Sequence, residues 1–561
     1  MTNLYPLMTV QDQIWDAITA AIDKAQNTGH LPACKLPHKS IEHPQNPTHG
    51  DYSSNIALRL SKPMKINPMQ IAELIEEYLD IESPIEAVSV AKPGFLNFNL
   101  DPTWVKRQVH GIIEMGAEYG DISLGRGAKI QIEFVSVNPT GPLHIGHARG
   151  AVVGSSLSNI LNAANFEVQN EYYVNDAGSQ IDNFAESIYA QYKKSKGIEV
   201  KISEDGYKGN YIDDIASNIA SSSEYNIEDM SEKTALNCIK DYGLNLMLTS
   251  IKQDLKSLRV HMDEWFSEKS LFENGTYDEI KSKLEKNNLL QRRDNALWFK
   301  SSDLGDDKDN VIEKSNGSPT YFASDIAYHY NKFALRDFEF VVDIWGADHQ
   351  GHIPRLKTVV QSLGIDPSRL RFIVTQMVKL KRGSTSVKMS KRSGELITLS
   401  EFINEVGSDA CRFFFLSRSA DSQLDFDIEL AQKQSSENPV YYIQYGHARI
   451  CSILKNAKEN SIQFDDGDVN LLNDPNELNL IKKILGLPEI IRLVSMRLEP
   501  HHLAHFALDL SSAFHLYYQN CKVISPNDQE LTKARLKLCE ATRITINRCL
   551  NLMGMSAPEK M

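Results

Sequence analysis

The 561-residue sequence lacks paired cysteines, long hydrophobic runs and an excess of positive charge. Its seven cysteines are scattered and form no C-x-x-C pair, which argues against a disulfide framework and against a thiolate zinc site. No uncharged apolar run reaches about 18 residues. The first positive charge is Lys24, so a secretion signal is not expected either. These absences predict a cytoplasmic protein with no membrane partner and no structural metal.

Charge and composition leave the class of partner open. The formal net charge of −13 gives no global attraction to polyanions, but local basic patches still allow a nucleic-acid partner. With 42% hydrophobic and 24% charged residues, the chain is neither disordered nor of low complexity. At about 150 residues per domain, its length predicts three or four domains.

The N-terminal part has the pattern of a small α/β unit. Apolar residues recur at helical spacing in 10–25 and 68–79, and short strands are expected at 87–90 and 95–100. A glycine-rich stretch at 120–127 marks a linker. We place a first domain at residues 1–115.

The next region has the pattern of a nucleotide-binding βαβ unit. A β-rich run at 129–137 leads through a turn into a helix expected over 143–164. A second strand, turn and helix follow at 338–363, and a further strand is expected over 370–379. We predict a Rossmann-like parallel-sheet core over 116–380, with a polar insertion around 192–317.

Beyond residue 400, helical spacing of apolar residues dominates. It recurs in 441–454, 478–493, 500–518 and 531–552, which indicates an α-bundle. We assign 381–435 to a loop and connecting region and 436–561 to a helical domain. The predicted fold is a multidomain α/β protein with a Rossmann-like core, a small N-terminal α/β domain and a C-terminal all-α bundle.

Two histidines follow the first core strand and its turn. His144 and His147 flank Gly146 where a helix is expected to begin, and a helix N-terminus offers free N–H groups that favour phosphate. Gly146 permits close approach to a nucleotide, and both imidazoles can donate hydrogen bonds to a triphosphate. The alternative is two surface or core histidines that share a helix face.

A basic segment, Lys-Met-Ser-Lys-Arg at 388–392, lies in an expected loop after the last core strand. Closely spaced cations on such a loop can close over the β and γ phosphates and stabilise departing pyrophosphate. A solvated basic loop is the alternative. The position of this segment after the two histidines favours the phosphate-binding interpretation.

Together these two segments resemble the signatures of class I aminoacyl-tRNA synthetases. The stretches 133–150, 173–180, 321–325, 345–352 and 438–449 are similar to those of bacterial arginyl-tRNA synthetases, and the resemblance covers essentially the whole chain. Arg392 stands where the general signature has serine, which leaves the cationic chemistry intact. Lys391 is present although many arginyl enzymes lack it, so no mechanism tied to its absence is assumed.

The resemblance implies ATP-dependent attachment of L-arginine to its cognate tRNA through an arginyl-adenylate, with release of AMP and pyrophosphate. ATP is then a substrate that enters with Mg²⁺, and we expect a monomer. The resemblance also implies that activation can require bound tRNA, that the helical domain binds the anticodon and that the N-terminal domain contacts the tRNA elbow. The implied catalytic residues are His144, His147, Lys388 and Lys391.

Selection of arginine over lysine needs planar acceptors for a guanidinium, and paired carboxylates suit it. Glu133 and Asp325 are the favoured pair, although each alone is also typical of a structural carboxylate. Similarity to the family's pocket implies the same two acids, with Asn138 at the α-amino end and Tyr321 and Gln350 nearby. The expected nucleotide-binding residues are His144, Gly146, His147, Gly346, Asp348, His349, Met389 and Ser390.

Two features of the helical domain fit a tRNA partner. The last helix is rich in basic residues, which suit either phosphate contacts or a solvated face. Tyrosines in 441–445 suit either base stacking or a bundle core. Resemblance to the anticodon-binding domain favours the first alternative in each case. The expected tRNA-binding residues are Tyr441, Tyr445, Lys533, Arg535 and Arg543.

Three other functions are alternatives to an arginyl-tRNA synthetase. Intact phosphate-handling motifs argue against a non-catalytic tRNA-binding relative. Among synthetases for other amino acids, the cysteine enzyme is disfavoured because no zinc-ligand cluster appears, and the large aliphatic enzymes because the polar insertion shows no clear editing pattern. A small adenylyltransferase would not need the C-terminal helical domain.

Overall fold

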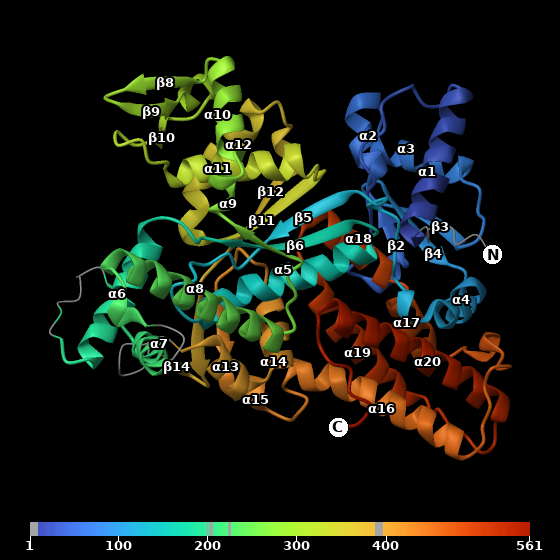
Figure 1. Ribbon diagram of the computed structural model, residues 1–561. Coiled ribbons are helices and arrows are strands. Elements are labelled where there is room, and N and C mark those ends of the chain that lie inside the picture. Colours follow the sequence, from blue (N-terminus) through green and yellow to red (C-terminus); the bar gives the residue numbers. More distant parts are fainter. Residues whose placement is uncertain (1–8, 199, 201–205, 223–225, 388–396) are drawn as a thin grey trace.

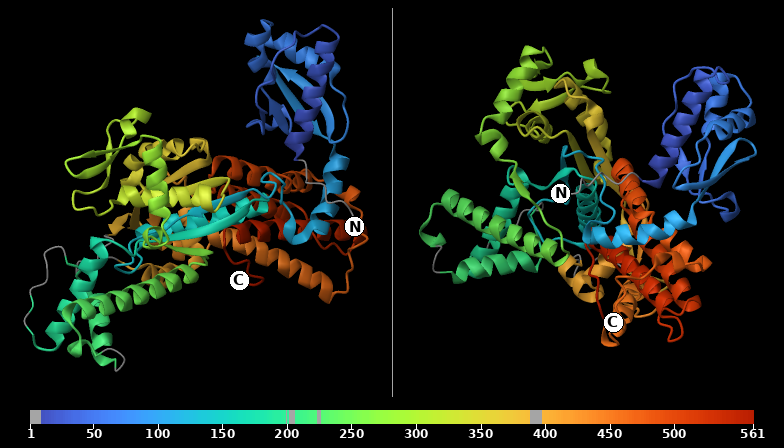
Figure 2. Two further views of the ribbon diagram at one scale, coloured as in Figure 1. Left: turned by 45° about the horizontal axis from the view of Figure 1, so that its top comes forward. Right: turned by 90° about the vertical axis from the view of Figure 1, so that its right-hand side faces the viewer.

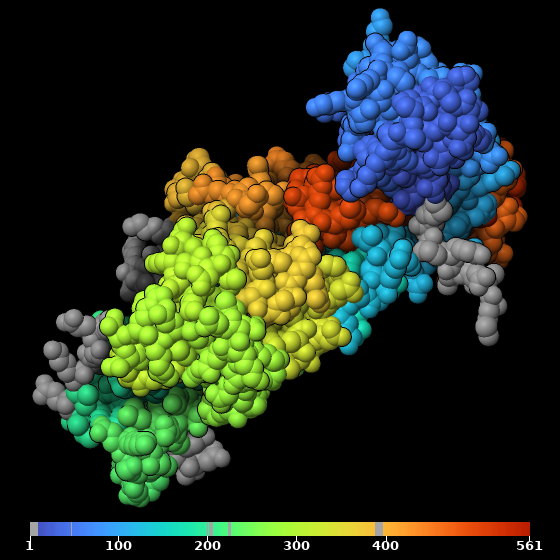
Figure 3. Space-filling view, turned by 90° about the horizontal axis from the view of Figure 1, so that it is seen from above, coloured from blue at the N-terminus to red at the C-terminus, as the bar shows by residue number. Residues whose placement is uncertain are grey.

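The computed structural model describes residues 9–198, 200, 206–222, 226–387 and 397–561. A small N-terminal α/β domain and a C-terminal helical bundle flank a central parallel sheet (Figure 1). The N-terminal domain lies at the opposite end of the molecule from helices α6 (Ser179–Ser195), α7 (Asn210–Ser221) and α8 (Glu232–Ser257) (Figures 1 and 3). Within the described ranges, no helix is long and apolar enough to cross a membrane.

The N-terminal domain packs helices on an antiparallel sheet of order β1-β2-β4-β3. Thr9 and Asp12 form a capping box at the start of α1, which satisfies free backbone donors there. The elements are α1 (Val10–Asn27), β1 (Ile41–Glu42), β2 (Tyr52–Ser54), α2 (Ile56–Met64), α3 (Pro68–Tyr78), β3 (Ile85–Ala91) and β4 (Phe95–Leu100). Helix α4 (Pro102–Met115) then leaves the domain and packs on the bundle.

The central sheet is parallel and five-stranded, with order β12-β11-β5-β6-β7. From β5 the chain adds β6 and β7 on one side and later β11 and β12 on the other. The strand order therefore reverses between β5 and β11, where open α/β sheets bind ligands beyond their carboxyl ends. The strands are β5 (Lys129–Glu133), β6 (Glu167–Val174), β7 (Glu264–Ser267), β11 (Phe340–Gly346) and β12 (Leu370–Thr375).

Helix α5 (Ile145–Ala163) follows β5 and is buried along most of its length. A Cβ built on Gly154 would lie 2.4 Å from the ring of Phe134, so only glycine allows this helix to approach the strand segment so closely. The first βα unit predicted from the sequence is thus present and tightly packed.

The stretch 192–317, predicted as an insertion, contains β7, the edge strand of the central sheet. This strand was not predicted because β7 has only four residues and lies between polar segments, so its sequence gives little strand signal. Around it lie a helical unit and a small sheet of order β10-β9-β8. Between residues 179 and 362, the α-helices and the strands outside the central sheet are α6 (Ser179–Ser195), α7 (Asn210–Ser221), α8 (Glu232–Ser257), α9 (Ser270–Glu273), α10 (Thr276–Lys286), β8 (Leu290–Arg293), β9 (Ala296–Phe299), β10 (Asn310–Glu313), α11 (Tyr321–Tyr330) and α12 (Ile353–Ser362).

The single strand predicted over 370–379 is two strands in different sheets. After β12 the Gln376 N–H donates to the carbonyl of Ala420, which turns the chain into β13 of a second, three-stranded sheet of order β14-β13-β15. The elements of this region are β13 (Val378–Arg382), β14 (Thr385–Val387), α13 (Leu399–Val406), α14 (Ser408–Leu416), β15 (Leu424–Asp427) and α15 (Ile428–Gln432).

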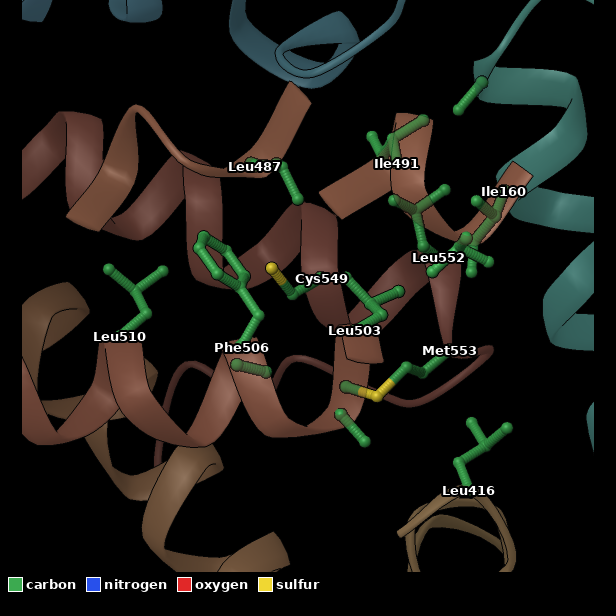
Figure 4. Close-up of a cluster of buried hydrophobic side chains, with 14 of the residues drawn as sticks. Ile160, Leu416, Leu487, Ile491, Leu503, Phe506, Leu510, Cys549, Leu552 and Met553 are labelled. Carbon is green, nitrogen blue, oxygen red and sulfur yellow. The ribbon is translucent and has the colours of Figure 1, made fainter. Parts of the chain in front are cut away.

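The C-terminal bundle shares its core with the central domain. Apolar side chains of α18 and α19 face α20, and Ile160 of α5 and Leu416 of α14 lie beside them (Figure 4). The helix predicted over 478–493 is interrupted at Gly486, and Pro488 stands in the first turn of the next helix. The helices are α16 (Pro439–Glu459), α17 (Pro475–Ile484), α18 (Leu487–Arg497), α19 (His501–Asn520) and α20 (Gln529–Leu552).

Polar contacts hold the N-terminal domain on the bundle, beside which it stands in the rotated views (Figure 2). Tyr52 donates to the buried carboxylate of Glu489 at 2.9 Å. Ion pairs at 2.6 Å join Asp51 to Lys482 and Asp12 to Arg492. The domain is therefore attached to α17 and α18.

Candidate active site

The two predicted histidines form the N-terminal cap of α5. His144 Nδ1 accepts from the N–H of Gly146 at 3.1 Å, and His147 Nδ1 accepts from the N–H of His144 at 3.3 Å. Because each Nδ1 is an acceptor, each neutral ring carries its proton on Nε2. Burial lowers the pKa of His144, and burial with the nearby His144 lowers the pKa of His147 to about 3. At neutral pH the pair is thus two neutral Nε2–H donors, with ring centroids 3.6 Å apart.

The chain just after the basic segment reaches this cap. Thr398 forms an antiparallel bridge with His144, and the Leu399 N–H donates to the Leu143 carbonyl at 2.8 Å. Val387 and Ile397 both pack on the central core. The predicted residues Lys388, Met389, Ser390, Lys391 and Arg392 lie outside the described residues. Residues flanking the second signature are therefore held at the first.

Arg149, one turn beyond the cap, connects α5 to the same region. Its guanidinium donates to the carbonyls of Gln376 at 3.0 Å, Ser419 at 2.8 Å and Ser422 at 2.6 Å. Gln376 lies two residues before β13, and β13 pairs with β14, which ends at Val387. The fully buried side chain of Arg149 thus connects α5, which carries the first signature, to the start of the segment that leads through β13 and β14 to the second.

A buried ionic network lies at the end of β5 and in the middle of β11. Glu133 and Asp343 are register partners on these strands. The ammonium of Lys332 lies between them, 2.7 Å from Glu133 and 2.8 Å from Asp343. His329 contacts the other Asp343 oxygen at 3.0 Å. Burial opposes ionisation of Asp343, but Lys332 and His329 together hold its pKa below the usual range.

Asp325 lies beside this network on α11. Among the described residues, no hydrogen bond reaches its carboxylate. Burial raises the pKa of Asp325 to about 7, and the carboxylates of Glu133 and Glu268 act in the same direction. Lys332 already pairs with Glu133 and Asp343, so the cluster has more carboxylates than cations. The predicted pair, Glu133 and Asp325, thus lies in one acidic cluster whose charge an additional guanidinium would neutralise.

Glu268 directly follows β7 and lies beside the same cluster. It is 4% exposed and accepts from Ser324 Oγ at 2.6 Å. Burial raises its pKa, and the charge of Asp176 adds to this shift. No sequence pattern indicated Glu268, because β7 before it gives too little strand signal. Asp343 was also missed, although a lone acid in an otherwise apolar strand was a usable signal.

The side chains predicted near the α-amino end of the substrate come from turns and from the first turns of helices. Asn138 contacts the side chains of Asn175, at 2.8 Å, and Gln180. Tyr321, at the first turn of α11, is 56% exposed, and a Cβ on Gly178 would lie 3.8 Å from its hydroxyl.

The predicted turn after β11 is exposed. Residues 347–352 form a short helical turn in which His349 pairs with Asp348 at 3.3 Å. Gly346 ends β11, and a Cβ there would lie 2.5 Å from an Asp348 oxygen. Gln350 is exposed on the same turn. Since β5 and β11 are neighbours, this turn and the His144 cap emerge from adjacent strands at one edge of the sheet.

Three family models match the chain. They describe the arginyl tRNA synthetase N terminal domain over 12–100, the class I (R) tRNA synthetase catalytic domain over 108–421 and the DALR anticodon binding domain over 443–561. The arginine–tRNA ligase of Dehalococcoides mccartyi is 50% identical over 555 residues, which are 99% of this chain and 100% of that protein. The chain belongs to the arginyl-tRNA synthetase family.

Solved structures of arginyl-tRNA synthetases have the same fold. One from Campylobacter jejuni has a TM-score of 0.75 at 33% identity, over 82% of this chain and 100% of that one. The Thermus thermophilus structure has a TM-score of 0.78 at 20% identity, over 99% of this chain and 100% of that one. The predicted family and fold class are confirmed.

In this arginyl-tRNA synthetase family member, the predicted tyrosines form part of an aromatic ladder. Tyr441 and Tyr445 on α16 are half-buried, and their rings stack with centroids 5.8 Å apart. Arg449 lies 4.6 Å from the Tyr445 ring and 4.8 Å from that of Tyr518 on α19. Partial exposure of this ladder favours base stacking over the bundle-core alternative.

The predicted basic residues of α20 are engaged within the protein. Each lies in an ion pair with an acidic side chain, and Arg535 is only 14% exposed. The pairs are Lys533 with Asp466 at 2.9 Å, Arg535 with Glu477 at 2.7 Å and Arg543 with Glu540 at 2.7 Å. This pairing favours a structural role for the three cations, and their contact with tRNA stays a prediction.

Proposed function

We propose that the protein attaches L-arginine to its cognate tRNA in two steps at the carboxyl edge of the central sheet. In the first, the arginine carboxylate attacks the α-phosphorus of ATP, which enters with Mg²⁺, and pyrophosphate leaves. In the second, a terminal ribose hydroxyl of the tRNA attacks the adenylate carbonyl and AMP leaves. The substrates supply the nucleophiles, so the protein contributes position and electrostatics.

The observation that carries this proposal is the bridge between His144 and Thr398. It holds the chain next to the second signature against the histidine cap, so one triphosphate can contact both. In the proposal, the Nε2–H groups of His144 and His147 donate to the α-phosphate as charge develops in the transition state. Lys388 and Lys391 then stabilise the departing pyrophosphate.

The guanidinium of arginine is proposed to bind Asp325 and Glu133, with Glu268 at the back of the pocket. Asp325 is the main partner because its carboxylate accepts no other hydrogen bond among the described residues, whereas Glu133 already binds Lys332. Asn138 then lies at the α-amino end and Tyr321 covers the opening. Lysine, with its compact ammonium, would leave part of this acidic surface unpaired.

For the nucleotide, the exposed turn 347–352 and Gly346 are proposed to contact the adenosine. For tRNA, we propose that the ladder of Tyr441, Tyr445, Arg449 and Tyr518 meets unpaired bases. We also propose a monomer located in the cytoplasm, where the described cysteines, all unpaired, would remain reduced. Light scattering of the purified chain tests the monomeric state.

The decisive experiment is ATP–pyrophosphate exchange by the full chain with tRNA present, using each amino acid in turn. Exchange that depends on arginine supports the proposal. Exchange that depends on another amino acid would reject the arginine pocket while keeping the class I reaction. Tight tRNA binding without any exchange would favour the non-catalytic rival.

A further inference from the structure

A group of side chains that can ligate a metal lies far along the chain from the catalytic residues assigned above. Among the described residues, Glu499, His501 and His502 bring one ligand atom each to within 4.8 Å of the others. Glu499 precedes α19 by two residues, and the histidines are its first two residues. Their placement at a chain turn, with all three side chains half-buried, leaves the cluster open to solvent on one side.

We propose that Glu499, His501 and His502 bind a borderline transition-metal cation of the Zn²⁺ type. Two imidazole nitrogens and one carboxylate oxygen are ligands that such cations accept, whereas Mg²⁺ and Ca²⁺ prefer sets of oxygen atoms. The site is therefore chemically distinct from the Mg²⁺ that enters with ATP. The scattered cysteines exclude a thiolate site only and do not bear on an imidazole site.

The geometry is close to what coordination needs. Zn–N bonds of about 2.0–2.1 Å in a tetrahedral site place ligand atoms about 3.4 Å apart. His502 Nε2 and Glu499 Oε2 are already 3.0 Å apart, and the rings of His501 and His502 have centroids 4.2 Å apart. The ligand atom of His501 lies within 4.8 Å of both, so side-chain movement of His501 would complete a three-ligand set, and water can take the fourth position.

The surroundings add favourable charge and a connection to the catalytic part. The carboxylate of Asp421 is near enough to His501 to act on its charge. His505, one turn further along α19, packs edge-to-face on His501 with centroids 5.6 Å apart. It donates to the Ser417 carbonyl at 2.9 Å, in the segment after α14 whose later carbonyls accept from Arg149. A bound cation would thus connect Glu499 to the first residues of α19, where the C-terminal bundle contacts the catalytic part.

The test is equilibrium competition between the full-length, chelator-treated protein and a chromophoric chelator for Zn²⁺. We expect one cation per chain. Loss of a direct ligand should cost at least as much as loss of an outer partner, so His501→Ala and His502→Ala should each raise Kd by about tenfold or more. His261→Ala is the matched control, because His261 also pairs with a carboxylate, Asp263, at 3.4 Å but belongs to no such three-residue group within the part of the chain that the structure describes.

Three results would overturn the proposal. They are no Zn²⁺ binding below about 100 µM, an unchanged Kd in both alanine variants, and a thiolate charge-transfer band in the Co²⁺-loaded protein, which would move the site to cysteine. Equal far-UV spectra and metal-free melting temperatures of wild type and variants would show that the variants fold. Added Zn²⁺ should raise the melting temperature of wild type and His261→Ala only.

Discussion

The raised pKa of Asp325 makes arginine binding depend on pH in a way that can be calculated. Its pKa is about 7 in the ligand-free protein, and only the ionised carboxylate pairs with a guanidinium. At about pH 8 roughly nine-tenths of the protein is then competent to bind, and at about pH 6 roughly one-tenth is. Apparent affinity for arginine should therefore be about tenfold weaker at about pH 6 than at about pH 8.

Calorimetric titration of the full chain with arginine across this range measures the effect directly. Near pH 7 binding should release protons, because the guanidinium favours the ionised carboxylate, so the apparent enthalpy should change with the ionisation enthalpy of the buffer. Asp325→Asn should lose about 10- to 100-fold in affinity, the value of a hydrogen bond to a charged group, and should lose the pH dependence.

Asp254 provides the matched control. Burial in α8 raises its pKa to about 6, but it is not among the pocket residues. Asp254→Asn should leave both arginine affinity and its pH profile unchanged. If wild type binds arginine equally at both pH values, or if Asp325→Asn keeps the wild-type profile, Asp325 does not pair with the guanidinium.

Four further substitutions, one of them a control, test the site and its support. His147→Ala should slow adenylate formation by about 100-fold with little change in arginine affinity, measured by pyrophosphate exchange, and an unchanged rate would remove the histidine from the mechanism. Lys332→Met leaves the buried carboxylates of Glu133 and Asp343 without their cation and should cost about 3–5 kcal/mol in urea unfolding; a loss below about 1 kcal/mol would contradict the network. Gly154→Ala should destabilise by about 1–3 kcal/mol because its Cβ would meet the Phe134 ring. Gly150→Ala, on the same helix with nothing within 4 Å of the added carbon, should stabilise by about 0.5–1 kcal/mol, and equal effects of the two would refute the close-packing argument.

Local sequence patterns predicted the parts of the fold that have local causes. The strand at β5, the helix α5 and the cap at His144 follow from hydrophobic spacing and turn chemistry, and each is present. The short strand β7 gave no usable pattern, so Glu268 was missed with it. Lys332 sits 199 residues from Glu133, and no local pattern encodes a charge pair across that separation. The ion pairs that engage the α20 cations are invisible to charge counting for the same reason.

Helix α5 explains why the nucleotide site and the tRNA-binding bundle are not mechanically independent. Its N-terminus carries the histidine cap of the proposed nucleotide site, and its middle lies beside the C-terminal end of α20. The buried guanidinium of Arg412 donates to the Met553 carbonyl at 2.5 Å and to Ser155 Oγ of α5 at 3.0 Å. A buried charge with several such acceptors permits little sliding, since any displacement leaves polar groups unpaired. Movement of α20 relative to the catalytic part must therefore break this junction or move α5, and a movement of α5 carries the histidine cap with it.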